Sequence, residues 1–166
     1  MEMQAVKELV NKYFCNSVDK GGNQYQQHLY TVAERAKELA NKYPNSSFEA
    51  NEAYTVGLLH DILEDTDCTE QELIDIGCND KILNAIKAIT RRKDEEHYFD
   101  FIKRVSENEL AKTVKIADLE NNMDITRLNE FGEHEMKRLK KYWYSWKFLR
   151  GELSKAQVNK ELEFVQ

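Results

Sequence analysis

The chain has 166 residues, of which 41% are apolar and 33% charged, and its formal net charge is −6. This composition excludes a disordered polymer and is typical of a globular protein long enough to bury a core. The acidic balance excludes a general affinity for duplex nucleic acid, which needs a basic face, but it allows a nucleotide substrate, because a metal ion and a few local cations can hold phosphates.

The sequence shows no pattern for export or membrane insertion. No apolar run approaches the length of a membrane span, and the segment MEMQAVKELV lacks the apolar core of a signal peptide. The three cysteines are odd in number and have no CxxC spacing, which favours idle thiols in a reducing compartment over a metal site. We therefore expect a cytoplasmic protein without membrane contact.

Apolar residues recur with helical spacing along nearly the whole chain, and one proline and six glycines leave little punctuation for β structure. The first stripe runs from Val6 to Phe14, and a second occupies 29–40 and is stopped by Pro44. A third helix is expected at about 48–63. It is the most apolar segment, so it should be central and buried on most sides.

Thr69 and Glu72 have the spacing of a capping box, which predicts a short helix that ends near Gly77. The last long stripe is closed by Gly151, and a short final helix is expected from Ser154 on. Between these points, apolar stripes with helical spacing occupy 82–89, 98–105, 110–117 and 136–149.

These elements predict an all-α fold. No repeat, linker or low-complexity tract divides the sequence, so we expect one domain over residues 1–166, with its motifs at about 19–130 and C-terminal helices at 131–166. The aromatic stripe of the last long helix can supply a homodimer face, although core packing explains such a stripe more often.

His60 and Asp61 follow directly on the apolar run VGLL. Neighbouring residues on a helix point about 100° apart, so both can reach one ion only near a helix end or a widened turn. Gly57, one turn earlier, leaves room for close packing there. Glu64 and Asp65 lie one turn further on and should face the same cavity. Three carboxylates within five residues repel each other in an apolar setting unless a cation or proton lies among them.

A solvated acidic helix end is the competing interpretation of HDILEDTD. Two other segments favour a metal site, because His28 and Asp118 also lie on half-apolar helices. A lone histidine is more often a packed or exposed residue, and we expect that of His97 and His134, which stand among charges. Together, two imidazoles and two carboxylates form a mixed site suited to Mn²⁺, Fe²⁺ or Zn²⁺.

Asn122 lies one turn after Asp118 on the same face, and Lys115 precedes Asp118 by three residues. A carboxylate, an amide and an ammonium on one face suit a metal with a phosphate or sugar nearby. Asn122 can equally cap its helix, and Lys115 is more often a surface lysine, so these alternatives stay open. The candidate phosphate-binding cations are Lys20, Arg91, Arg92, Lys115 and Arg127.

The three motifs resemble those of the HD-domain metal-dependent phosphohydrolases, and most of all the alarmone hydrolase domains of the Rel/Spo type and the small alarmone hydrolases. The family pattern HDxxEDT is matched at 60–66, KLADxxxNM at 114–123 and GxPYxxHP, in part, at 22–29. The resemblance covers about 19–130. It implies a single-domain helical HD fold.

The resemblance also implies one Mn²⁺-like ion, with Fe²⁺, Zn²⁺, Co²⁺ and Ni²⁺ as alternatives, and a nucleotide substrate. Its implied ligands are His28, His60, Asp61 and Asp118. Its implied catalytic carboxylates, which position or deprotonate the attacking water, are Glu64 and Asp65. The residues expected to contact substrate are Lys20, Tyr25, Arg91, Lys115 and Asn122.

The chain departs from the family where the base should bind. The family stacks guanine on a basic pair upstream of the first histidine, and Asp19 and Lys20 occupy those positions here, while Leu29 replaces a proline. A carboxylate at Asp19 cannot stack as a guanidinium does, and it repels phosphate.

The expected activity is hydrolysis of the 3′-pyrophosphate of a guanosine alarmone. The alternatives are another nucleotide phosphoester and a non-catalytic nucleotide-binding regulator. Retention of Glu64 and Asp65 argues against the regulator, because a pure binding protein needs no water-activating pair. A purely structural helical protein is the remaining alternative.

Overall fold

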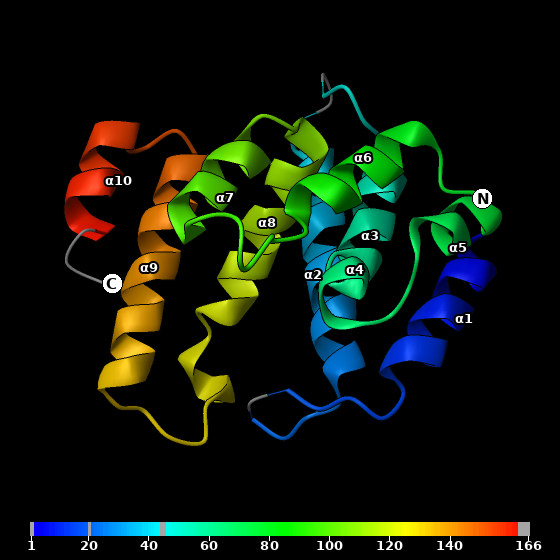
Figure 1. The fold of residues 1–166 in the computed structure, drawn as a ribbon, viewed down its shortest axis with the longest axis horizontal. Helices are drawn as coiled ribbons and strands as arrows, with labels where there is room; N and C mark the ends of the chain where they lie inside the picture. The colour runs from blue at the N-terminus through cyan, green and yellow to red at the C-terminus, as the bar shows by residue number, and fades with distance from the viewer. Residues whose placement is uncertain (1, 20, 44–45, 163–166) are drawn as a thin grey trace.

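The computed structural model describes residues 2–19, 21–43 and 46–162, which contain helices and no strand. Within these ranges, an isolated bridge between Val18 and Gln24 is the only pairing of extended backbone. The all-α prediction is therefore confirmed. The elements shown in Figure 1 are α1 Met3–Phe14, α2 Tyr25–Asn41, α3 Ala50–Leu59, α4 Ile62–Asp65, α5 Glu70–Asp75, α6 Asp80–Ile89, α7 Tyr98–Ser106, α8 Glu109–Asn122, η1 Ile125–Arg127, α9 Glu133–Leu149 and α10 Lys155–Leu162.

Helices α2, α3 and α8 pack against one another in the middle of the fold, with α1 and α5 towards one end and α9 and α10 at the other (Figure 1). Helix α3 is buried on most sides, as its composition predicts. The apolar stripe at 29–40 on α2 is likewise buried. The three central helices are those that carry the histidines and aspartates of the motifs.

Close contact between α2 and α3 depends on Gly57. A β-carbon at Gly57 would lie 2.5 Å from the Cα atom and 3.1 Å from the Cβ atom of Ala33. A larger residue at either position would therefore force the two backbones apart. This geometry confirms that Gly57 provides the close packing expected from the sequence.

The expectation of one continuous helix over 48–63 is wrong, because α3 ends at Leu59 and α4 begins at Ile62. The physical cause is the ring of His60, whose Nδ1 donates to the Gly57 carbonyl at 2.7 Å. In a continuous helix that carbonyl would accept from the amide of Asp61. The resulting turn supplies the helix end that His60 and Asp61 need in order to face one ion.

The prediction that the apolar stripe over 136–149 packs against the core is also partly wrong. Met136 and Trp143 are 59% and 45% exposed, whereas Ser145 and Leu149 are buried. The face of α9 that meets the fold combines Ser145 with Trp146, Phe148 and Leu149, so the apolar stripe identifies this face only in part. The capping box of α5 and the final helix α10 are present as predicted. Within the described residues, no helix has both the length and the apolar character required to span a bilayer.

We predict that Gly57→Ala destabilises the protein. The added methyl group overpacks the α2–α3 contact, which costs about 1–3 kcal/mol, and this exceeds the gain of about 1 kcal/mol in helix propensity. Denaturant unfolding measures the change. Gly132→Ala is the control, because the nearest atom to a β-carbon at Gly132 is 3.7 Å away. Equal stability of Gly57→Ala and wild type would contradict the packing argument.

Candidate active site

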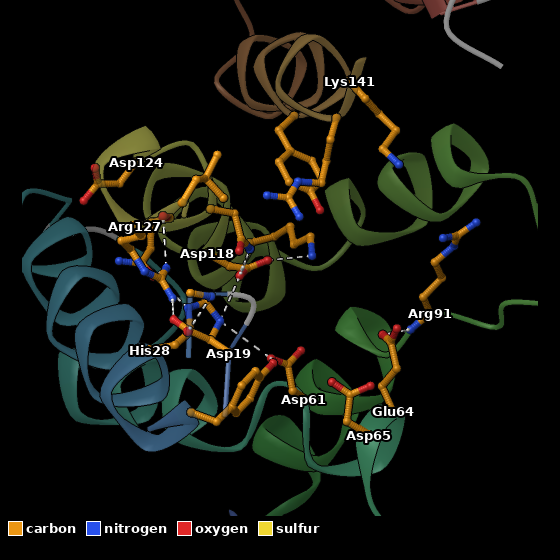
Figure 2. A pocket seen from close by; sticks show the side chains of 18 of the residues that line it. Asp19, His28, Asp61, Glu64, Asp65, Arg91, Asp118, Asp124, Arg127 and Lys141 are labelled. Atoms are coloured by element: carbon orange, nitrogen blue, oxygen red, sulfur yellow. Dashed lines mark hydrogen bonds and ion pairs between the residues drawn. The ribbon is translucent and has the colours of Figure 1, made fainter. Parts of the chain in front are cut away.

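The three central helices bring four ligand-type side chains together. His28 comes from α2, His60 and Asp61 from the turn between α3 and α4, and Asp118 from α8. Figure 2 shows His28, Asp61 and Asp118 of this set. The Nε2 atom of His60 lies 2.9 Å from Asp61 Oδ2 and 3.6 Å from Asp118 Oδ1. The Nε2 atom of His28 lies 3.7 Å and 3.4 Å from the same two oxygens. The sequence therefore identified four residues that do converge.

The donor set fits a divalent cation. The ligand-type atoms of His28, His60 and Asp61 all lie within 4.8 Å of one another. Both imidazoles use Nδ1 for hydrogen bonds elsewhere, so each directs Nε2 inwards. His60 Nε2 is buried and makes no hydrogen bond within the described part of the chain, despite its closeness to Asp61. Two nitrogen and two oxygen ligands are typical of Mn²⁺, Fe²⁺ or Zn²⁺ sites.

Charges in the cluster perturb one another strongly. Burial lowers the pKa of both imidazoles, but the carboxylates of Asp118 and Asp61 outweigh it and raise the pKa to about 9 for His28 and about 10 for His60. Burial raises the pKa of Asp118, but Lys115 and the histidines hold it well below its usual range. In the absence of a cation, His28 and His60 therefore stay protonated at neutral pH, on the side chains that would bind the metal.

Lys115 and Asn122 both contact Asp118, which decides between the alternatives left open by the sequence. Lys115 Nζ lies 2.7 Å from Asp118 Oδ2, and its side chain is 14% exposed. Asn122 Nδ2 donates to Asp118 Oδ1 at 2.6 Å. Lys115 is thus no surface lysine, and Asn122 faces the cluster instead of capping its helix. Both side chains orient this carboxylate.

Glu64 and Asp65 of α4 line the same cavity as the cluster (Figure 2). Glu64 accepts from the backbone amide of Arg91 at 3.0 Å and pairs with Lys93 at 3.1 Å. Burial and the charges of Asp61 and Glu64 raise the pKa of Asp65. A carboxyl group with a raised pKa is suited to exchange a proton with a nearby water.

Tyr25, expected at the substrate, directs its hydroxyl to Asp61 and donates to Oδ2 at 2.5 Å. Burial and the Asp61 charge raise the pKa of Tyr25, so the phenol stays protonated and remains a donor. Its ring also lies against His28. The predicted contact Lys20 lies outside the described residues.

A cavity of about 370 Å³ opens in front of the cluster. Arg91 lines it, as predicted, while its neighbour Arg92 does not. Sequence reasoning missed the contribution of α9 and α7. The aromatic and cationic side chains that these helices add are Tyr98, Phe101, Arg138, Lys141 and Tyr142.

The cations opposite Arg127 are stacked on aromatic rings. Arg91 lies 5.4 Å and Lys141 4.5 Å from the ring centre of Tyr98, and Arg138 lies 5.9 Å from that of Tyr142. The Nε atoms of Arg91 and Arg138 are buried donors without a hydrogen-bond partner among the described residues. The missed signal is the spacing of Arg138, Tyr142 and Ser145, which places all three on the inward face of α9.

Asp19 is not the free charge that the sequence predicts. Its Oδ2 accepts from Nη2 of Arg127 at 2.7 Å, and its Oδ1 accepts from the amides of Gly21 and Asn23 at 2.9 Å each. Burial raises the pKa of Asp19, but Arg127 and these amides outweigh it and lower the pKa. The negative charge of Asp19 is therefore neutralised within the wall of the cavity.

The metal-free protein should lose stability as the pH rises from about 6.5 to about 10. Folding raises the pKa of His28 and His60 above the ordinary 6.5, so protonated imidazoles stabilise the folded state most below that value. That stabilisation is lost as each group deprotonates near pH 9 to 10. Thermal unfolding in excess chelator measures the trend.

The control is a His28→Gln/His60→Gln variant, which should show a weaker dependence over this range. In saturating metal, the stability of the wild type should instead rise with pH. The cation requires deprotonated imidazoles and therefore stabilises the folded state more as the pH rises. A melting temperature of the metal-free wild type that rises with pH would contradict this assignment.

Residues 25–123 match the sequence profile of the HD domain family, and this span contains all four converging ligand-type residues. No protein with a curated description matches the chain by sequence. Among solved structures, the chain is similar to a metazoan ortholog of SpoT that hydrolyzes ppGpp and plays a role in starvation responses. That match has a TM-score of 0.70 and 18% identity over 98% of this chain and 92% of the other, and it shows the fold alone.

The family match covers more than half of the chain, and it includes His28 and Asp118, the first and last of the four ligand-type residues in the sequence. The converging imidazoles and carboxylates agree with it independently. The chain belongs to the HD domain family and is a metal-dependent phosphohydrolase.

Proposed function

We propose that the protein hydrolyses a phosphorylated nucleotide, and that its best substrate is a guanosine 3′,5′-bispyrophosphate-like alarmone cleaved at the 3′-pyrophosphate. The observation that carries this proposal is the cavity itself, which is lined by His28, Asp61 and Asp118 of the metal-type cluster and by Arg91 and Arg138, whose Nε donors have no hydrogen-bond partner among the described residues. The proposed metal ligands are His28, His60, Asp61 and Asp118.

His28, His60, Asp61 and Asp118 would hold a divalent ion, which would supply Lewis-acid polarisation of a phosphoryl oxygen and make a nearby water more acidic. The protein's own part is to position and deprotonate that water. Glu64 is held by the Arg91 amide and Lys93, so its carboxylate is fixed as an acceptor that orients the water. Burial and the charges of Asp61 and Glu64 raise the pKa of Asp65, which suits this carboxylate to accept the water proton. Tyr25 and Asn122 keep the ligand carboxylates in position.

The distribution of cations supports a substrate with two phosphorylated positions. Arg91 and Lys141 lie on the opposite side of the cluster from Arg127 (Figure 2). Guanidinium groups recognise phosphate through paired, charge-assisted hydrogen bonds. One phosphate group can therefore react at the cluster while Arg91 holds a second, with Arg138 as a further guanidinium in the lining of the same cavity. The similarity to a ppGpp hydrolase is consistent with such a substrate.

A nucleotide panel with Mn²⁺ tests the proposal. The panel contains guanosine 3′,5′-bispyrophosphate, its adenosine counterpart, nucleoside 5′-monophosphates and cyclic nucleotides, with products identified by chromatography and ³¹P NMR. We expect pyrophosphate release from the 3′ position, with the highest kcat/KM for the guanosine compound. Turnover of the monophosphates or cyclic nucleotides alone would overturn it in favour of another nucleotide phosphoester.

Glu64→Gln and Asp65→Asn should remain folded and metal-loaded but lose about two to four orders of magnitude in kcat, the usual scale for a general acid–base group. Single-substrate kinetics with measured metal content provide the test. Asp67→Asn is the matched control, because Asp67 is exposed and does not line the cavity. Near wild-type rates in both site variants would remove these carboxylates from the water-activating role.

Arg138→Gln should raise KM for substrates with two phosphorylated positions by about tenfold or more, because a hydrogen bond to a charged group contributes about 1.5–3 kcal/mol. Its effect on kcat should be smaller. Lys137→Gln is the control, since Lys137 lies beside the outer, apolar face of α9. A fall in kcat with unchanged KM would mean that Arg138 does not bind the substrate phosphate.

A further inference from the structure

His28 and His60 differ in what holds their second ring nitrogen. His60 Nδ1 donates to a backbone carbonyl, that of Gly57, which is only ever an acceptor. His28 Nδ1 lies 2.7 Å from the side-chain oxygen of Asn121. A carboxamide presents an oxygen at one end and a donor NH₂ at the other. The amide of Asn121 therefore fixes the His28 tautomer only if its own orientation is fixed.

Arg127 fixes that orientation. Its Nη1 donates to the side-chain oxygen of Asn121 and, at 3.2 Å, to the Asn121 backbone carbonyl. A guanidinium has donors and no acceptor, so the end of the amide that faces Arg127 must be the oxygen. The same oxygen then accepts from His28, which places the ring proton on Nδ1 and leaves the Nε2 lone pair for a metal.

Arg127 is itself held by a loop from a distant part of the chain. Nη2 donates to Asp19, and the backbone of Gly21 packs so closely that a β-carbon there would lie 2.3 Å from the Arg127 carbonyl oxygen. Asp19 and Arg127 are 108 positions apart in the sequence. Asp19 and Gly21 are therefore joined to the 3₁₀ helix η1 beside Asn121, the partner of His28.

We propose that Arg127 is a positioning residue that sets metal affinity by locking the Asn121 amide, and through it the His28 tautomer, with Asp19 as its anchor. This inference rests on the proposed metal ligands and extends them. Its donors to Asn121 and Asp19 direct Arg127 away from the role of phosphate-binding cation that its sequence position allows. The Asp19–Arg127 pair thus acts on the metal centre and not on the substrate phosphate.

The sign of the effect distinguishes positioning from simple electrostatics. Removal of a positive charge near a cation site raises cation affinity if charge alone matters. Loss of a partner that orients a metal-bound histidine instead lowers affinity by about 10–100-fold. We therefore expect Arg127→Met to weaken Mn²⁺ binding by that factor, measured without substrate by electron paramagnetic resonance.

The Asn121→Asp variant is the background in which the effect of Arg127→Met should disappear if Arg127 acts by orienting the Asn121 amide. A carboxylate is an acceptor at both ends, so its orientation needs no lock, and Asn121→Asp alone should bind Mn²⁺ at least as tightly as wild type. Adding Arg127→Met to this background should change the affinity by less than about threefold, because contributions that share one network are not additive. Arg35→Met is the control for loss of a half-buried arginine, since Arg35 pairs with Glu120 away from the cluster.

Each outcome is decisive. An equal loss in the two backgrounds, or tighter binding in Arg127→Met, overturns the proposal. Loss of metal on His28→Gln without any effect of Arg127→Met overturns the positioning role alone and leaves the proposed ligands intact. Unchanged Mn²⁺ affinity in His28→Gln would overturn both the proposed metal ligands and the positioning role of Arg127. In the Zn²⁺-loaded protein, a His28 Nδ1–H correlation in NMR spectra should be present in wild type and lost or exchange-broadened in Arg127→Met.

Discussion

The contact between α2 and α3 at Gly57 is the constraint on which the site depends. The missing side chain lets Ala33 approach closely, and this brings His28 and His60 within 5.3 Å between ring centres. The carbonyl of the same glycine accepts a hydrogen bond from the His60 ring at the end of α3. Asp61 follows in the turn before α4 and faces the cluster. A packing feature and a hydrogen bond at one residue thus determine both the distance and the direction of the ligands.

The charges that this arrangement buries are unfavourable without a counter-ion. His28, His60 and Asp118 are buried and the Asp61 side chain is 18% exposed, and Lys115 compensates only part of the negative charge. Protons on the histidines are one form of compensation, and a divalent cation is the other. Folding stability, proton uptake and metal binding are consequently linked in this protein, and the same residues that perform the chemistry cost stability when they are unfilled.

Much of the site could be predicted from the sequence because its ligands stand beside apolar runs. His60 and Asp61 after VGLL, and Asp118 within a helix with one apolar face, could be recognised without the structure. The metal hypothesis required a helix end or a widened turn at His60, but helical periodicity over 48–63 gave no sign of where α3 ends, because the hydrogen bond from the His60 ring to the Gly57 carbonyl leaves no trace in the pattern.

The α9 face and the Arg127 network were missed for two further reasons. Helical periodicity assigns the apolar side of α9 to the core, but the inward side lines a polar cavity and carries Arg138 and Tyr142. The Asp19–Arg127 pair joins distant segments, and no local pattern encodes it. Both are tertiary features of the site wall, where polar residues facing a ligand override the usual relation between hydropathy and burial.

The central claim is that the cluster at the meeting point of α2, α3 and α8 holds one divalent ion. Elemental analysis of the purified protein, with Asp61→Asn and Asp118→Asn measured in parallel, tests it most directly. The account predicts about one transition-metal ion per chain in wild type and loss of most of it in each variant, because the remaining ligands no longer complete the site. A wild-type protein without metal, or variants with an equal content, would contradict it.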